Sequence, residues 1–281
     1  MGALRRGELH GFAGALFAVA ALLVVPAFAT PPLSADQIVE KSIAARGGLQ
    51  TWTKIDSLAW IGHIESERLG GQELKFSLEE KRPNKTRFDL IGAQPSARVF
   101  NGMKGWKTHS RNDGPPEVES YSQFEERFAR EAPGFGGPLI AYREQRRQFT
   151  LLGIDPIEGR DCYRLGVVLP AGGQQTIWVD AQTFLEARFD RPTYTREGKV
   201  GTVSVYFRNY QTQGGLQLPT VFEIGAGGTG KPDRLVIERV AINPDISESR
   251  FLRPPAPPHS REVTLPPSGS TFGAPAVPPP K

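Results

Sequence analysis

Acidic side chains on predicted strands are the residues of this 281-residue chain best suited to chemistry. Two carboxylates on facing strands could act as general acid and general base across the mouth of a curved sheet. The candidates are Glu65, Glu67, Glu79, Asp89, Glu186 and Glu223. Alternating strands also place charged side chains on their solvent faces by default, and the sequence singles out no pair. We therefore predict a protein that is not an enzyme and has no catalytic residue.

Histidine, cysteine and glycine patterns give no support to metal, nucleophilic or phosphate chemistry. The four histidines show neither HExxH nor His-x-His spacing, and Gly-x-Ser-x-Gly is missing. Cys162 is alone, and its place beside Tyr163 in an apolar strand is typical of a buried small residue. Residues 225–231 resemble a phosphate loop, but no Ser or Thr follows Lys231 and a strand comes next, which indicates a hairpin turn. The sequence predicts no metal and no cofactor.

The charge of the chain argues against a nucleic-acid partner. The net charge is +4, and the basic residues are scattered along the sequence. Arg143, Arg146 and Arg147 are the closest approach to a basic cluster, with Glu144 between them. A nucleic-acid surface usually needs a denser stripe. We therefore expect no nucleic acid among the partners.

The N-terminus predicts export. Arg5 and Arg6 precede a small and apolar run over residues 12–25, and Ala29 ends a small-x-small cleavage site before Thr30. Residues 1–29 are thus a predicted signal peptide, and the mature protein is expected in the periplasm. Because Thr30 is not a cysteine, the protein itself should not be acylated. No second apolar segment is long enough to span a bilayer, so the mature form should have no stable membrane span.

The mature chain is predicted to be mainly β. Ser34 and Gln37 form a capping box that begins a short helix, which glycine ends at Gly47. From residue 57 to 243, alternation and short Gly-containing turns indicate about eleven antiparallel strands. Residues 120–147 interrupt them with a helical aromatic stripe. Residues 254–281 are Pro-rich, hold few large apolar residues, and are predicted to form a disordered tail.

A sheet of about eleven strands curls into a barrel or a half-barrel, and so few short helices cannot fill its apolar inner face. The hairpin 175–189 illustrates this, because its apolar face should border the concavity while Trp178 lies on the outer surface or under the N-terminal helix. The other inner-face residues predicted are Leu74, Leu165, Val167, Val203, Val205, Phe207, Val221 and Ile237. The candidate ligand-binding residues of the apolar cavity are Trp60, Phe76, Leu78, Phe88, Leu90, Trp106, Phe124, Phe128, Ile177, Val179 and Phe189. The sequence therefore predicts a binding site for an apolar ligand.

A series of short motifs resembles the LolA/LolB-like superfamily of periplasmic proteins that sort outer-membrane lipoproteins. The motifs lie at residues 35–41, 45–49, 81–85, 101–106, 157–165, 179–185, 210–219 and 242–251. The resemblance spans about residues 35–253 and implies an unclosed β-barrel with an N-terminal helix and a helical lid over an apolar cavity. Residues 30–253 would form this half-barrel domain. Arg87 and Arg98 are strand-borne candidates for the family's functional arginine.

Three functions follow from these features. The first is a periplasmic carrier that binds acyl chains of lipoproteins or other lipids, and the resemblance implies a role in outer-membrane biogenesis. The second is a lipid-sensing or scaffolding module that regulates a protein partner in the cell envelope. The third is a hydrolase with a carboxylate pair at the cavity mouth. The sequence favours the carrier.

Overall fold

The computed structural model describes residues 32–70, 72–111, 114–169, 173–194, 200–226 and 231–253. The predicted signal peptide, with its cleavage site between Ala29 and Thr30, lies outside these residues, and so does the predicted Pro-rich tail. Every element described below belongs to the compact unit that begins at Leu33.

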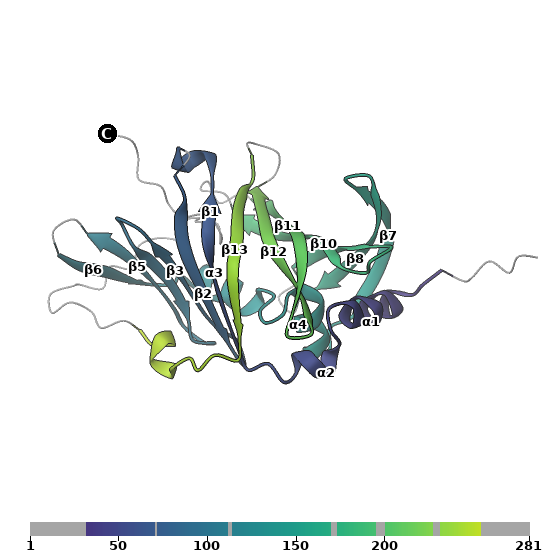
Figure 1. The fold of residues 1–281 in the computed structure, drawn as a ribbon, viewed down its shortest axis with the longest axis horizontal. Coiled ribbons are helices and arrows are strands. Elements are labelled where there is room, and N and C mark those ends of the chain that lie inside the picture. The colour runs from purple at the N-terminus through teal and green to yellow at the C-terminus, as the bar shows by residue number, and fades with distance from the viewer. Residues whose placement is uncertain are drawn as a thin grey trace, which may run out of the picture. The chain divides into compact units, whose positions relative to one another are not determined.

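A sheet of thirteen antiparallel strands forms the body of this unit, in two meanders (Figure 1). The first meander comprises β1 (Ser57–Glu65), β2 (Leu74–Lys81), β3 (Lys85–Ile91), β4 (Ser96–Phe100), β5 (Gly105–Arg111) and β6 (Gly114–Ser120). The second comprises β7 (Phe149–Ile157), β8 (Arg160–Val168), β9 (Gln174–Asp180), β10 (Glu186–Tyr194), β11 (Val200–Gln213), β12 (Leu216–Ala226) and β13 (Asp233–Ile242). The strand order ends at β6 on one side and β7 on the other, so the curved sheet stays open. The predicted fold class is confirmed.

The strand count exceeds the prediction of about eleven, and β6 accounts for much of the difference. Its sequence contains Pro115 and Pro116, which argue against a strand because proline cannot donate to the hydrogen-bond ladder. β6 pairs only with β5 in the sheet order, so it is an edge strand. An edge strand tolerates proline, which explains why pattern reading missed it.

The pairing of β1 with β13 joins the two meanders. Leu58 lies opposite Ile242 and Glu65 opposite Arg234, with one irregularity of register at Gly62. A Cβ atom on Gly62 would lie 1.9 Å from the carbonyl oxygen of Val236, so the two backbones can approach this closely only because residue 62 is glycine. We call this pairing the seam.

The helices lie before β1 and between the two meanders. They are α1 (Ala35–Ala45), α2 (Leu49–Trp52), α3 (Gln123–Glu131) and α4 (Pro138–Glu144), with 3-10 turns η1 (Glu67–Leu69) and η2 (Glu248–Phe251). The predicted capping box of Ser34 and Gln37 is present in α1, and Ser122 with Glu125 forms a second one in α3. We call residues 121–147, which contain α3 and α4, the cover segment. No helix in the described residues is both long and apolar enough to cross a membrane.

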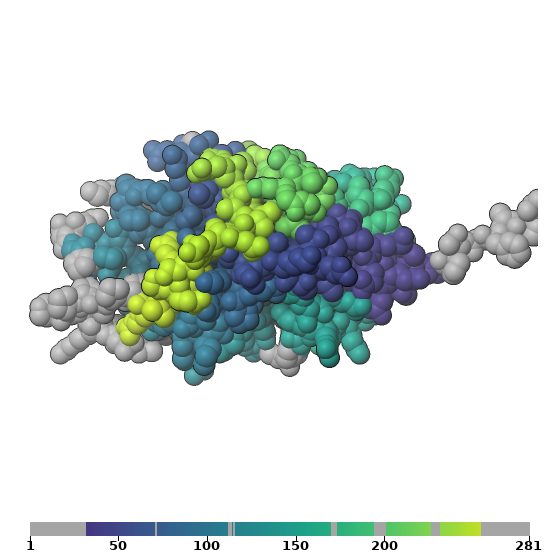
Figure 2. Space-filling view, turned by 60° about the horizontal axis from the view of Figure 1, so that its bottom comes forward, coloured from purple at the N-terminus to yellow at the C-terminus, as the bar shows by residue number. Residues whose placement is uncertain are grey.

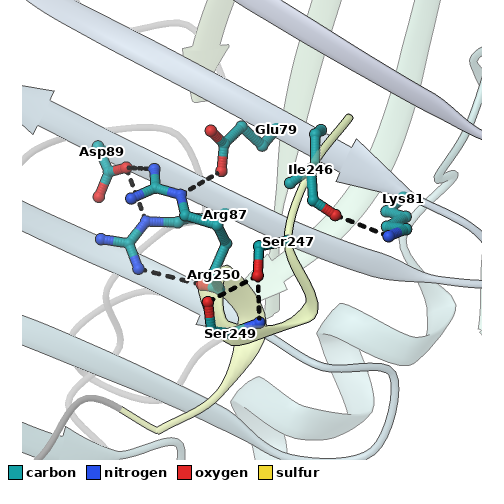
Figure 3. A network of polar contacts seen from close by, with 8 residues as sticks. All are labelled: Glu79, Lys81, Arg87, Asp89, Ile246, Ser247, Ser249 and Arg250. Atoms are coloured by element: carbon teal, nitrogen blue, oxygen red, sulfur yellow. Dashed lines mark hydrogen bonds and ion pairs between the residues drawn. The ribbon is translucent and has the colours of Figure 1, made fainter. Parts of the chain in front are cut away.

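The C-terminal segment (residues 243–253) lies on the convex face of the first meander, where Figure 2 shows it in yellow over the blue strands. Ile246 and Phe251 are buried there with Ala97 and Val99. Polar contacts surround this cluster (Figure 3). Arg250 binds Glu79 at 2.9 Å and Asp89 at 3.0 Å, Arg87 binds Asp89 at 2.7 Å, and Lys81 donates to the Ile246 carbonyl at 2.7 Å. These contacts fix the C-terminal segment to β2 and β3.

Gly62 is expected to be essential to the seam. Gly62→Ala should lower the free energy of unfolding by at least about 2 kcal/mol, because the added methyl group meets backbone rather than a movable side chain. Gly225→Ala is the matched control, since a Cβ at this strand glycine meets nothing nearer than 3.6 Å. Urea titration of both variants checks this. Equal midpoints for the two variants would contradict the role of Gly62.

His63 should make the stability of the seam depend on pH. Its Nδ1 lies 2.8 Å from Glu238 across the seam, and its Nε2 lies 3.6 Å from Glu65 and 3.7 Å from Glu73. The hydrogen bond to Glu238, with the neighbouring carboxylates, raises the pKa of His63 against a smaller opposing effect of burial. A raised folded-state pKa gives stability that is complete below the ordinary pKa and is lost as pH rises through the raised value.

We therefore expect His63→Gln to be less stable than the natural protein at about pH 5.5 and closer to it at about pH 8.5. Chemical denaturation at the two pH values measures the difference. Glu238→Gln should reduce the same pH dependence, because it removes the group with the largest effect on the His63 pKa. A stability difference that is constant with pH would exclude this role.

Candidate functional site

A cavity of about 410 Å³ lies between the concave face of the sheet and the cover segment. Both meanders contribute to its wall, and residues 128–138 of the cover segment lie over it. Its size falls within the roughly 300–1,000 Å³ of small-molecule sites. The apolar side chains of its wall include Trp60, Phe76, Leu78, Phe88, Leu90, Phe128, Phe189, Val205, Phe207, Phe222, Ile224, Leu235 and Ile237.

Most of the residues predicted to line a cavity do so. The structure brings together Trp60, Phe76, Leu78, Phe88, Leu90, Phe128 and Phe189. Register explains this, because Trp60 lies opposite Leu78, and Leu78 lies opposite Phe88 on the same face of neighbouring strands. Phe76 stacks on Phe88 with ring centroids 5.4 Å apart. On these strands, the apolar positions of the alternating sequence pattern therefore face the cavity, and the positions between them face the convex side.

Trp106 lies on the other side of the sheet. It packs on the convex face against the cluster of Ala97, Val99, Ile246 and Phe251, and does not line the cavity. Its neighbour Gly105 takes the concave position, where the ring of Tyr121 occupies the space that a Cβ would need. The sequence-based placement of Trp106 on the inner face was wrong because the hairpin register puts glycine there instead.

Ile177 and Val179 lie on the concave face but under helices rather than beside the cavity. Both are fully buried, in one cluster with Ile43 of α1 and with Leu139 and Ile140 of α4. The expectation that the apolar face of the hairpin 175–189 borders the cavity is therefore corrected for Ile177 and Val179, whereas Phe189 of the same hairpin does line the cavity. The ring of Phe124 lies tilted against that of Phe128, with the centroids 6.2 Å apart, and Phe124 is also not among the residues that line the cavity.

Trp178 lies on the convex face, one of the two places that the sequence allowed. It is buried with Cys162 and Ala187, and the Arg188 guanidinium lies 4.5 Å from its ring centroid. Its Nε1 donates to Asp155 at 3.1 Å. Burial raises the pKa of the Cys162 thiol, which suits the predicted role of a small buried residue rather than a nucleophile.

One carboxylate lies in the described wall of the cavity, and it is none of the sequence candidates. Glu80 accepts a hydrogen bond from Trp60 Nε1 at 2.9 Å, and burial raises the pKa of its carboxyl group. Glu65, Glu67, Glu79, Asp89 and Glu223 do not line the cavity. The described residues therefore offer no pair of carboxylates across the cavity. They also contain no group of three or more His, Cys, Asp or Glu that could hold a metal ion.

Glu186 has a structural role, because it forms a buried ion pair with Arg46 at the end of α1. Arg46 also donates to the carbonyls of Gln217 at 2.7 Å and Gly136 at 3.0 Å. Glu186 accepts from the backbone amide of Leu139, at the start of α4, at 3.0 Å. The pair thus ties α1, the second meander and the cover segment together. The residue types alone did not indicate this pairing, since the two lie 140 positions apart.

Arg82 fixes the cover segment from the other meander. Its guanidinium makes two hydrogen bonds of 2.8 Å to Glu144 of α4 and donates to the carbonyls of Trp52 and Ile55. It also lies 4.7 Å from the ring centroid of Phe135. Of the two arginines proposed from the sequence, Arg87 pairs with Asp89 on the convex face, and Arg98 lines the cavity.

The open antiparallel sheet, the N-terminal helix and the helical cover over a cavity define a fold of the LolA type. The resemblance expected from the sequence is confirmed at the level of the fold. Two crystal structures illustrate it. A LolA superfamily protein from Nitrosomonas europaea superposes with a TM-score of 0.51 and 15% sequence identity, over 79% of this chain and 98% of that one. A DUF1329 family protein from Desulfovibrio piger has a TM-score of 0.51 and 13% identity, over 77% and 96%.

Sequence comparison alone gives no such link. The chain matches no family pattern, and no curated protein is similar to it in sequence. At 13–15% identity, the structural likeness establishes the fold alone. What the cavity binds has to be argued from its own residues.

The Arg46–Glu186 pair is expected to contribute strongly to stability. Glu186→Gln leaves the Arg46 guanidinium buried and uncompensated, so the free energy of unfolding should fall by about 3–5 kcal/mol. Glu131→Gln is the control, because it breaks the partly exposed ion pair of Arg127 and Glu131 within α3, and such a pair is worth about 0.5 kcal/mol. Denaturant titration measures both. A loss below about 1 kcal/mol in Glu186→Gln would refute the structural role.

Proposed function

We propose that this protein is a periplasmic carrier that binds the acyl chains of lipoproteins or other lipids. The observation that carries the proposal is the apolar cavity of about 410 Å³ under the cover segment. Each methylene moved from water into such a site contributes about 0.8 kcal/mol, so one acyl chain is enough for useful affinity. Aromatic and aliphatic side chains from both meanders supply that environment.

The chemistry of the wall favours binding over catalysis. A hydrolase of the kind considered from the sequence needs two carboxylates that face each other across the site. The described wall offers Glu80 alone, with its raised pKa and its hydrogen bond from Trp60. Carriage is therefore the better supported function, and we propose no enzymatic activity.

The predicted signal peptide supports the periplasmic location. Residues 1–29 have the charged start, apolar run and small-residue cleavage site of exported proteins. The fold shared with a LolA superfamily protein agrees with an envelope role in lipoprotein sorting or lipid transport. The alternative of a sensing or scaffolding module uses the same cavity and adds a protein partner of the envelope. Pull-downs that lose a partner when residues 254–281 are deleted would favour that alternative.

The direct test is a lipid extract of the protein purified from its own periplasm. Native mass spectrometry should show copurified acyl chains, and a fluorescent fatty acid should bind the delipidated protein with saturation. An empty cavity together with no uptake of the fatty acid would overturn the proposal.

A substitution that fills the cavity should weaken this binding. Leu78 is half-buried in the cavity wall, so Leu78→Trp should lower the affinity for the fluorescent fatty acid by about tenfold or more, as expected when an apolar pocket is closed. Ile61→Trp is the matched control, because Ile61 lies on the convex face of the neighbouring strand and is 38% exposed. The control should bind like the natural protein. Equal affinities of the two variants would place the ligand elsewhere.

A further inference from the structure

Polar side chains lie together at one end of the cavity wall. Glu80 of β2 lies opposite Thr86 of β3, and Asn84 belongs to the turn between these two strands. All three residues line the cavity. A Cβ atom on Gly134 of the cover segment would lie 3.3 Å from Asn84 Oδ1. The polar end of the wall, defined by Glu80, Asn84 and Thr86, therefore lies where the first meander meets the cover segment.

The carboxyl group of Glu80 is held by one oxygen and is accessible at the other. Its Oε2 accepts a hydrogen bond of 2.9 Å from Trp60 Nε1, and an indole N–H can only donate. Its Oε1 makes no hydrogen bond with the described part of the chain, and this atom is not enclosed. Because Glu80 is half-buried and lines the cavity, Oε1 is the oxygen that a ligand can reach.

The surroundings of Glu80 favour the protonated carboxyl group. Burial raises the pKa of Glu80, and the hydrogen bond from Trp60 lowers it by a smaller amount. The arginines of the wall, Arg46, Arg98 and Arg191, each contact another side chain and are not among the described groups that shift this pKa. In a protonated carboxyl group the carbonyl oxygen is the better acceptor, so the proton belongs on Oε1. Glu80 Oε1 is then a hydrogen-bond donor in the cavity wall.

An apolar stretch of wall begins next to this donor. Leu78 and Phe76 precede Glu80 at alternate positions on the same face of β2, opposite Phe88 and Leu90 of β3. From Glu80 to Phe76 the strand covers about 14 Å, at about 3.4 Å for each residue. A ligand with an oxygen at Glu80 can therefore extend an acyl chain along these two strands.

We propose that Glu80 determines the specificity of the cavity by donating a hydrogen bond to the carbonyl oxygen of an acyl ester with an uncharged, hydroxyl-bearing head group. An acylglyceryl group is the ligand of this class. Its hydroxyls lie at Asn84 and Thr86, whose amide and hydroxyl groups can donate and accept hydrogen bonds. Its acyl chain lies along Leu78 and Phe76. This inference rests on the proposed function, since it names the class of lipid that the same cavity takes.

The test compares two ligands that differ at the ester carbonyl alone. Delipidated protein is titrated with 1-monolauroylglycerol and with 1-O-dodecylglycerol, its ether analogue, below their micelle concentrations. The natural protein should bind the ester about threefold to tenfold more tightly, as one neutral hydrogen bond implies. A wall without a donor would reverse this order, because the ester carbonyl would lose its water without compensation.

An acylglyceryl group can belong to a free lipid or to a lipidated protein. In the same titration, a synthetic peptide with this group on an N-terminal cysteine identifies a lipidated protein if it displaces 1-monolauroylglycerol, and a free acylglycerol if it does not.

Glu80→Leu should abolish the preference for the ester, because leucine cannot donate a hydrogen bond. The ratio of the two affinities should fall to about one or below. Glu80→Gln is the conservative variant, and most of the preference should remain, since its amide can still accept from Trp60 and donate to the ligand. Glu79→Leu is the matched control, because the neighbouring Glu79 lies on the convex face and pairs with Arg250. It should keep the full preference.

The possible results separate this inference from the proposed function. Equal or weaker binding of the ester by the natural protein would overturn the recognition of the carbonyl and leave the carrier function intact. Binding of the fluorescent fatty acid but of neither glycerol lipid would have the same meaning. A preference that persists in Glu80→Leu, or is lost in Glu80→Gln, would overturn the role of Glu80 as donor. Binding of none of these ligands would overturn both proposals. If Glu80→Leu does not fold, the natural protein and Glu80→Gln decide.

Discussion

The pairing of β1 with β13 is the constraint on which the rest of the structure depends. Each meander is built from neighbours in sequence, and the seam between these two strands turns them into one sheet. Its close backbone approach at Gly62 leaves no room for a side chain. The cavity extends across the seam, because Leu78 belongs to one meander and Phe207 to the other. Without the seam, there would be two smaller sheets and no shared concave face.

Two ion pairs then fix the position of the cover segment on that concave face. Arg46 with Glu186 holds it from the second meander, and Arg82 with Glu144 holds it from the first. The helices α1 and α4 fill the concave face over Ile177, while the face around Phe76 keeps an open volume. The chain thus divides one apolar surface into a packed core and a binding space. The guanidinium of Arg191 lies where that space meets the cover segment.

Alternation of apolar and polar residues was enough to predict much of this fold. It gave the mainly β class, the capped first helix and the cavity positions of Trp60, Phe76 and Phe88, because a strand with one apolar face has little freedom in orientation. It failed at Trp106, where the register of a hairpin decides the face and Gly105 makes room for Tyr121. A single position of register reverses such an assignment.

The polar residues of the site were less predictable, for a different reason. Arg46 and Glu186 come into contact only in the folded chain, and no local sequence pattern predicts a contact between residues 140 positions apart. Arg191 lies in a strand whose neighbouring charged residues, Arg188 and Asp190, face the convex side. Alternation from Phe189 would put Arg191 on the inner face, which is the one signal that could have identified it.

The seam also sets the order in which the chain can fold. The two meanders consist of local hairpins, whereas the hydrogen bond between Asp56 and Asn243 at the end of the seam joins residues 187 positions apart. Closing a loop of that length costs conformational entropy before the contacts of the seam can form and stabilise the chain. The local hairpins are therefore expected to form first and the seam last. Until then β1 and β13 are unpaired edges, open to strands of other molecules. Newly synthesised chains would therefore be most prone to aggregation, and most in need of a chaperone, in the interval before these two strands meet.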